Sequence, residues 1–399
     1  MRPADLARLE KPYPRSTDGT SNSDFASALG LGLTNLRRLD AAIRGDLDFD
    51  VFGIGWWRTD DSETRENRQR RILVSDYLLT ALEGVESNLV DLALHFLELQ
   101  GAWEQESAFI RDSVTVNAGR PVMKSPQRTR PVHDLPHALV DMHTNGVFRA
   151  SGSVLDCLAA VVIGVGALET NILRADWGAL VRTVLKKLPP STLDGPKMQL
   201  EMRDELYRLL GVGTADWDAW SNDYRNMLVH RGQRLVLSWV RPESHVVDGR
   251  GVPVVHAGLV QLLTRDPDLS EIEAFALQDQ GLFVLSENAR ITITGIVKDV
   301  EKLVDELASY LIGIWERRRA TPTLLPQPVT KQWPTVRRRA QRSFMGYRPG
   351  ETAFQPSAMN LNPRVVDRLR AAGLGSDFAE QTWDGIGSIP PAGPSSGHR

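Results

Sequence analysis

Residues 217–233 read WDAWSNDYRNMLVHRGQ and predict a helix with two chemically different faces. At about 100° per residue, the large aromatic side chains recur at three- and four-residue spacing and form one apolar stripe: Trp217, Trp220 and Tyr224. Arg225, Asn226 and His230 fall on the other side of the cylinder. One face is therefore expected to pack into a core, while the other presents a cation, an amide and an imidazole to solvent or to a partner.

Apolar residues at helical spacing recur along much of the chain. They predict further helices at residues 25–45, 64–110, 135–145, 148–173, 176–188, 197–210 and 286–319. The short helix at 135–145 is expected to stop at Asn145-Gly146, and the helix at 148–173 is apolar nearly all round, as in the centre of a bundle. The sequence therefore predicts a mainly α fold, a helical bundle.

Two stretches break the helical pattern. Residues 112–133 contain prolines and no periodicity, which predicts a loop. Residues 234–240 and 252–255 are β-type runs on either side of an Asp248-Gly249 turn signal, which favours a hairpin. We therefore expect a small β-type insertion at about 233–285, before the last helix.

The ends of the chain differ in composition from the middle. Residues 1–24 are rich in proline and small polar residues and predict a flexible arm, followed by an N-terminal extension at 25–64. The bundle itself is expected at 65–319. Residues 320–399 hold many of the 23 prolines and an arginine run, which predicts a largely disordered tail.

Composition limits the classes of function. Hydrophobic residues make up 42% of the 399 positions, enough for a real core, and the net charge of −3 gives no general attraction to nucleic acid or anionic lipid. The single cysteine, Cys157, excludes an internal disulfide framework and a cysteine-rich zinc site. The N-terminal residues lack the apolar core of a signal peptide, and the most apolar run, 158–168, is about half the length that crosses a bilayer. These features predict a cytoplasmic protein that does not bind membranes.

The polar face of the 217–233 helix carries an arginine followed by asparagine and, five residues after the arginine, a histidine: Arg225, Asn226 and His230, in the form RN-x3-H. An arginine and a histidine separated by four to six residues also occur by chance elsewhere, at Arg128/His133, Arg130/His137 and Arg250/His256. Those pairs lie in a proline-containing segment or in the β-type stretch. Only Arg225/His230 lies on a clear amphipathic helix within a bundle.

This motif resembles that of ribonucleases of the HEPN superfamily (higher eukaryote and prokaryote nucleotide-binding domain). The resemblance implies an α-helical domain that cleaves RNA without a metal or other cofactor, leaving a 2′,3′-cyclic phosphate and a 5′-hydroxyl. His230 would act as general base or acid on the ribose 2′-hydroxyl. Arg225 would stabilise charge on the phosphate oxygens, and Asn226 would position either group.

The resemblance also implies partners. Members usually dimerise with their motif helices facing each other, so Arg225, Asn226 and His230 are expected to be exposed together and to face a second copy. We expect further RNA contacts from Asn222, Arg231 and Arg234. A role as a toxin or in phage defence would add an antitoxin or a regulatory protein as a partner.

In two respects the chain departs from the family pattern or leaves it incomplete. Some members carry a modifiable tyrosine two residues after the histidine, and that position is Gly232 here. The acidic side chain that assists some members is not identified by the sequence, and Asp218 and Asp223 are only nearby candidates.

Three alternatives remain at this point. The chain could be a catalytically inactive HEPN-like module that binds nucleotide, RNA or protein. It could be an unrelated helical protein, with Arg225 in a salt bridge inside the bundle and His230 favouring the helix C-terminus. Finally, the cluster His133, His137 and His143 could bind a metal, but Asp134 suits a helix N-cap, which would leave His133 outside the helix. No metal site is therefore expected.

Overall fold

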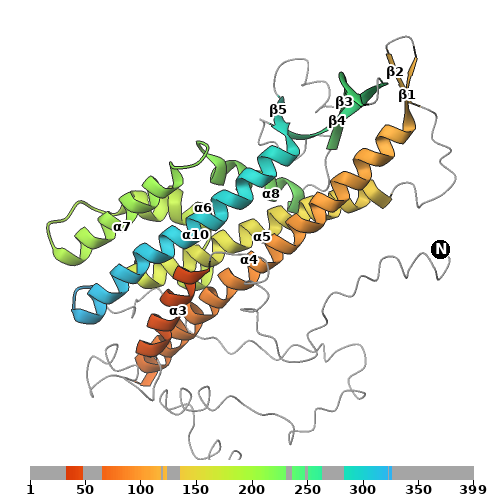
Figure 1. The fold of residues 1–399 in the computed structure, drawn as a ribbon. Coiled ribbons are helices and arrows are strands. Elements are labelled where there is room, and N and C mark those ends of the chain that lie inside the picture. The colour runs from red at the N-terminus through yellow and green to blue at the C-terminus, as the bar shows by residue number, and fades with distance from the viewer. Residues whose placement is uncertain are drawn as a thin grey trace, which may run out of the picture.

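The computed structural model describes the bundle and parts of its connections: residues 33–47, 65–117, 120–123, 135–230, 236–247, 250–262, 283–321 and 323–325. Helices make up most of these residues, so the fold is mainly α, as the sequence predicts (Figure 1). The expected arm at 1–24 and the tail beyond residue 325 lie outside the described residues.

Four helices form the main body of the bundle: α3 (Thr34–Leu47), α4 (Arg65–Ser113), α5 (Leu135–Gly166) and α10 (Ala289–Ala320). In Figure 1 the three long helices α4, α5 and α10 run side by side, and α3 lies across one end of them. Helix α5 packs against both α4 and α10. It therefore lies at the centre of the core.

The composition of α5 explains its central place. In its C-terminal half, buried residues lie on every side of the helix: Leu158, Ala159, Ala160, Val161, Val162, Ile163 and Val165. Burying each valine, leucine or isoleucine among them is worth about 1.5–3 kcal/mol relative to leaving it exposed. A helix that is apolar all round reaches this gain only when other helices cover it.

Helix α5 is continuous through Asn145 and Gly146, so the prediction that a first helix stops there is wrong. The Asn145 side chain donates to the backbone carbonyl of Asp141 at 2.9 Å, a bond that is compatible with the helix. Gly146 lies against the ring of His95 on α4, where a side chain would collide. The glycine therefore serves close packing of α4 on α5 rather than termination.

The predicted extension of this helix to residue 173 is also wrong, because α5 ends at Gly166. Ala167 has a φ of 47°, in the left-handed region, which ends the helix. Short turns follow: η3 (Ile172–Arg174), α6 (Trp177–Ala179), η4 (Leu180–Val184) and η5 (Leu185–Lys187). The chain then forms α7 (Asp194–Leu210) and α8 (Trp217–His230).

Strands connect some of the helices. The pair β1 (Val114–Asn117) and β2 (Arg120–Met123) is antiparallel and lies in the stretch expected as a loop. Between α8 and α10, β3 (Val236–Val247), β4 (Arg250–Leu262) and β5 (Phe283–Asn288) pair antiparallel in that order.

A buried arginine near the end of α10 closes the C-terminal end of α5. The guanidinium of Arg318 donates to the carbonyl of Gly164 at 2.9 Å and also to that of Val165. The last carbonyls of a helix have no partner inside the helix, so this contact satisfies two of them. Burial lowers the pKa of Arg318 to about 10, so the side chain is still charged at neutral pH.

Helices α3 and α10 are joined by a buried hydrogen bond. The indole N–H of Trp315 on α10 donates to the carboxylate of Asp46 on α3 at 2.8 Å. After α10 the chain turns back, and Leu325 is buried against the start of α7, where Gly195 lies under the carbonyl of Leu324. The bundle therefore includes the first residues of the segment that was expected to be a disordered tail.

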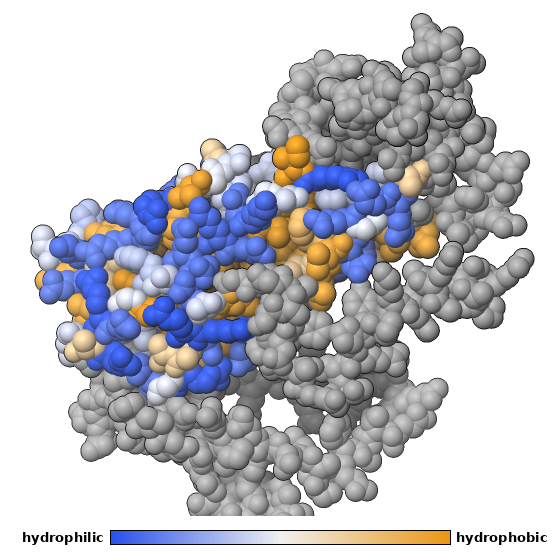
Figure 2. Space-filling model, viewed as in Figure 1, coloured by the Kyte–Doolittle hydropathy of each residue, from blue (hydrophilic) through white to orange (hydrophobic). Residues whose placement is uncertain are grey.

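The stretch His137–Gly166 of α5 is long and apolar enough to cross a membrane. However, 72% of its most apolar window is buried inside the bundle, as expected for a core helix. On the face shown in Figure 2, hydrophilic residues are interspersed with hydrophobic ones along the described helices.

Candidate functional site

The aromatic stripe of α8 packs on α5, as the sequence predicts. The ring of Tyr224 lies 4.4 Å from that of Phe148 on α5, and the ring of Trp220 lies 5.2 Å from that of Tyr224. Trp217 is also buried, one turn earlier. Since Tyr224 and Arg225 are neighbours on the helix, this packing fixes the position of the arginine beside α5.

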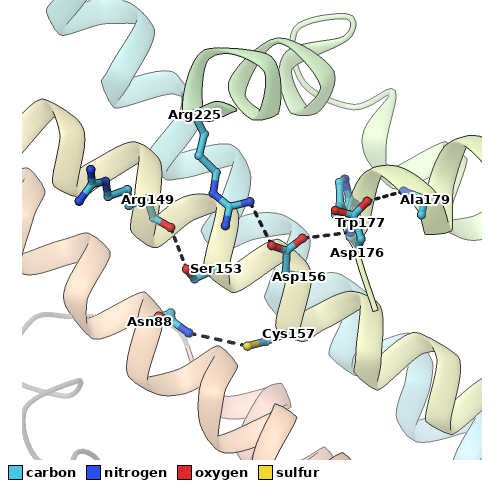
Figure 3. Close-up of polar contacts among 9 residues, drawn as sticks. All are labelled: Asn88, Arg149, Ser153, Asp156, Cys157, Asp176, Trp177, Ala179 and Arg225. Carbon is cyan, nitrogen blue, oxygen red and sulfur yellow. Dashed lines mark hydrogen bonds and ion pairs between the residues drawn. The ribbon is translucent and has the colours of Figure 1, made fainter. Parts of the chain in front are cut away.

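Arg225 does not extend into solvent but lies along the surface of α5. Its Nη1 atom is 3.0 Å from Oδ2 of Asp156, and the two side chains are 23% and 28% exposed. A Cβ atom at Gly152 would lie 2.2 Å from Cδ of Arg225, so the missing side chain of this glycine makes room for the arginine. Figure 3 shows the arginine reaching from α8 to the carboxylate on α5.

The carboxylate of Asp156 also binds a second element. Its Oδ1 atom accepts a hydrogen bond from the backbone N–H of Trp177 at 3.1 Å, in the first turn of α6. Burial raises the pKa of Asp156, an effect opposed by the Trp177 N–H and by Arg225. One carboxylate therefore joins α5 to both α6 and α8 (Figure 3).

The predicted site residues lie in different surroundings. Asn226 is exposed, as expected, but Arg225 is mostly buried and Asn222 is 9% exposed. The expectation of a jointly exposed polar face is therefore wrong for Arg225 and Asn222, because α8 packs closely against α5 at Gly152. Helix α8 ends at His230, whose side chain lies outside the described residues, as do Arg231 and Arg234.

Sequence reasoning did not find Asp156 as the acidic partner of Arg225. The nearby candidates have other surroundings, since Asp218 accepts a hydrogen bond from the Trp177 indole at 3.1 Å and Asp223 is exposed. Asp156 is separated from Arg225 by 69 positions along the chain. A signal was present, because an acidic residue in the apolar run around Leu155 and Leu158 requires a partner.

The expected histidine cluster separates into two groups. His137 Nδ1 lies 3.0 Å from a carboxylate oxygen of Glu106, whereas His143 Nδ1 lies 3.2 Å from Nδ1 of His95. His133 lies outside the described residues. Within the part of the chain that the structure describes, no three histidine, cysteine or acidic side chains come together as a metal site.

A groove of about 490 Å³ lies between α4 and α5. Its polar lining comes from both helices: Asn88, Asp91 and His95 of α4, and Asn145, Arg149 and Ser153 of α5. In Figure 3, Arg149 and Ser153 lie on the same side of α5 as the arginine of α8. Two residues of the groove lining therefore lie near the ion pair.

The arrangement at Arg225 suits anion binding. A guanidinium has five N–H donors in a fixed fork, and Asp156 engages it at one end. The carboxylate orients the fork, and an orienting partner of this kind fixes a positively charged group before a ligand arrives.

Comparison of the chain with family models, with curated proteins and with solved structures finds no match.

Proposed function

We propose that this protein is a metal-independent endoribonuclease of the HEPN superfamily, with its active centre on α8. The observation that carries the proposal is the orientation of Arg225 by Asp156, a carboxylate 3.0 Å away on a different helix. The RN-x3-H motif supplies the remaining groups. We infer that Asp156 is the acidic helper that the motif alone does not identify.

In the proposed reaction, His230 removes the proton from the ribose 2′-hydroxyl, which then attacks the adjacent phosphate. Arg225 stabilises the negative charge that builds on the phosphate oxygens, and Asn226 positions the reacting groups. The bond from phosphorus to the 5′ oxygen breaks, and this oxygen takes up a proton from the protonated His230 or from water, which leaves a 2′,3′-cyclic phosphate and a 5′-hydroxyl.

The proposal includes a homodimer with facing α8 helices, in which the exposed Asn226 contributes to the interface. It also includes a cytoplasmic location and a role as a toxin or in phage defence, with an antitoxin or regulatory protein as partner. The strands between α8 and α10 would then be an insertion in a HEPN-like bundle. Sedimentation at micromolar concentration tests the dimer. A monomer at all concentrations would contradict an active site formed between two copies of α8.

Cleavage of labelled RNA in excess EDTA tests the chemistry. We expect wild-type protein to produce cyclic-phosphate ends, and Arg225→Ala and His230→Ala to lose at least about 100-fold in rate. Arg208→Ala, an exposed arginine on α7 that pairs with Glu205, should cleave like wild type. Equal cleavage by all variants, or none by wild type over a broad RNA panel, would refute catalysis at this site.

One observation favours a second function, a non-catalytic module that binds nucleotide, RNA or protein. The Asp156 carboxylate neutralises part of the charge of Arg225, which also suits a structural ion pair. Fluorescence anisotropy with labelled RNA separates the two. Binding that depends on Arg225, without any cleavage, would support the module.

A further inference from the structure

The side chains that line the groove between α4 and α5 present hydrogen-bond acceptors to it. Asn88 of α4 donates from its side-chain NH₂ group to the carbonyl of Gly84 at 2.7 Å, and Asn145 of α5 donates in the same way to the carbonyl of Asp141 at 2.9 Å. An asparagine side chain carries its donors on the nitrogen and its acceptor on the oxygen. In both residues the nitrogen is therefore engaged by the helix backbone, and the amide oxygen is left for a ligand.

Ser153 and Asp91 add acceptors to the two walls of the groove. The Ser153 hydroxyl donates its one hydrogen to the carbonyl of Arg149 at 2.9 Å, so its oxygen can only accept further bonds. Asp91 is exposed on α4, and an ionised carboxylate also only accepts. Among the residues that the structure describes, no cation forms an ion pair with Asp91. A ligand that matches this lining must bring several N–H donors.

Arg149 supplies a positive charge on the α5 wall of the groove. It is exposed one turn before Ser153, and the described part of the chain offers it no ion pair. Other exposed arginines of the bundle are paired, such as Arg208 with Glu205. The guanidinium of Arg149 is therefore available to an anion, and its fork of N–H groups matches the oxygens of a phosphate.

The α5 wall of the groove leads toward the proposed active centre. Figure 3 shows Arg149, Ser153 and Asp156 along α5, with Arg225 reaching to this helix from α8 and Asn88 on the neighbouring α4. Arg149 and Asp156 are separated by seven residues, about 10 Å along the helix axis. One short stretch of a nucleic acid strand can therefore contact both Arg149 and Arg225.

We propose that this groove binds one nucleotide of an RNA strand and selects a base that carries an amino group. The inference rests on the proposed function for RNA as the ligand and adds the base preference. Arg149 binds a phosphate, and the base reaches the acceptors of Asn88, Asp91 and Asn145. The groove volume of about 490 Å³ lies within the range of about 300–1,000 Å³ that is typical of ligand sites.

The charges on the two walls set the orientation of the nucleotide. The carboxylate of Asp91 repels a phosphate from the α4 wall, whereas Arg149 attracts it to the α5 wall. The backbone of the strand therefore follows α5, and the base points toward α4. Met142 and Ala150 are apolar parts of the lining against which the flat face of the base can pack.

The acceptors distinguish cytosine from uracil, two bases of the same size. Cytosine carries an amino group, a donor, at the position where uracil carries a carbonyl oxygen, an acceptor. Uracil therefore places an acceptor against acceptors, and an unpaired polar group weakens binding. A polyamine also brings N–H donors, but Arg149 repels it.

Fluorescence anisotropy of the full chain with labelled 2′-O-methyl oligo(C) and oligo(U) tests the proposal. The methyl group blocks attack by the 2′-hydroxyl, so binding is measured whether or not the protein is a ribonuclease. We expect wild type to bind oligo(C) about 5- to 10-fold more tightly than oligo(U). Asp91→Ala removes an acceptor from the base site, and this variant should reduce the preference to about twofold or less.

Arg149→Gln should have a different effect. Contacts to phosphate carry no sequence information, so this variant should weaken both oligonucleotides by about the same factor and leave the preference for oligo(C) unchanged. Arg174→Gln is the matched control, since Arg174 is an exposed arginine beyond the end of α5 that has no ion pair among the described residues. It should bind like wild type.

The outcomes separate this proposal from the ribonuclease. Equal binding of oligo(C) and oligo(U) by wild type, no binding of either, or wild-type affinity in Arg149→Gln would overturn the groove proposal, even if RNA cleavage depends on Arg225 and His230. A preference for oligo(C) that depends on Asp91, with affinity that depends on Arg149, would support the groove even if no RNA is cleaved in EDTA.

Discussion

The guanidinium of Arg225 lies 3.0 Å from the carboxylate of Asp156, across the contact between α8 and α5. Both side chains are about three-quarters buried, so the pair is neither a solvent-exposed ion pair nor a fully buried one. Exposed pairs are worth about 0–1 kcal/mol, and loss of one partner from a fully buried pair costs about 3–5 kcal/mol. We therefore expect the interaction free energy of this pair to lie between those of exposed and fully buried pairs.

A double-mutant cycle with Asp156→Asn and Arg225→Gln measures this value. We expect a coupling free energy of about 1–2 kcal/mol in urea unfolding, because each single variant leaves the other group without its charged partner. The more exposed pair of Arg317 and Glu201 is the control and should show a smaller coupling. A coupling near zero for Arg225 and Asp156 would mean that solvent already screens their charges.

Gly152→Ala should destabilise the protein even though alanine favours helix. The new Cβ atom would lie 2.2 Å from Cδ of Arg225 and force the arginine away from Asp156, at a cost of about 1–3 kcal/mol. At Gly313 on α10 a Cβ atom meets nothing within 4 Å, so Gly313→Ala should stabilise by up to about 1 kcal/mol. Urea unfolding of the two variants should therefore give changes of opposite sign.

Asp141→Asn should stabilise the protein at neutral pH. Burial raises the pKa of Asp141, although His137 lowers it in part. An acid whose pKa is higher in the folded than in the unfolded state binds more protons when folded, so its contribution to stability falls as pH rises through that window. The charged wild-type carboxylate is then penalised above its folded pKa, and asparagine removes the penalty.

The pH dependence provides the check on this prediction. The difference in the free energy of unfolding between Asp141→Asn and wild type should be positive at pH 7.5 and shrink as the pH falls through the raised folded pKa of Asp141, because the wild-type carboxyl then becomes neutral. Asp223→Asn, at an exposed position on α8, is the control. A difference that grows on acidification would contradict the assigned direction.

Arg318→Met should lower the free energy of unfolding by about 2–4 kcal/mol. The carbonyls of Gly164 and Val165 would each lose a donor, which leaves Gly164 with only the 3.4 Å bond from the Ala167 N–H, and an unpaired buried polar group costs about 1–3 kcal/mol. The adjacent Arg317→Met removes an arginine that is half exposed and should change stability by less than about 0.5 kcal/mol. Similar losses for both variants in urea unfolding would show that the carbonyl contacts contribute little.

The sequence predicts what depends on local periodicity. The stripe of Trp217, Trp220 and Tyr224 follows from residue spacing alone, and these residues pack toward α5 as expected. The central place of α5 likewise follows from its apolar composition. Helix boundaries are harder to predict from the sequence. Gly146 suggests a helix stop, but it lies within α5, where its missing side chain leaves room for the ring of His95.

The partners of the candidate site could not be predicted, because they come from contacts between distant segments. Periodicity places Arg225 on the outer side of α8 but does not say that α8 crosses α5 at Gly152. The choice of Asp156 over Asp218 depends on that crossing, and so does the burial of Asn222. The partners and the burial of side chains on one helix therefore depend on where a second helix packs against it.

The hydrogen bond between Asp46 and Trp315 sets a limit on folding during synthesis. Its two residues are 269 positions apart, so it cannot form until nearly all of the bundle has left the ribosome. At ~5–20 residues per second, that delay is roughly 15–50 seconds. During this time the carboxylate of Asp46 lacks its partner, the indole of Trp315. The face of α3 that packs against α10 stays uncovered by that helix until α10 has been synthesised.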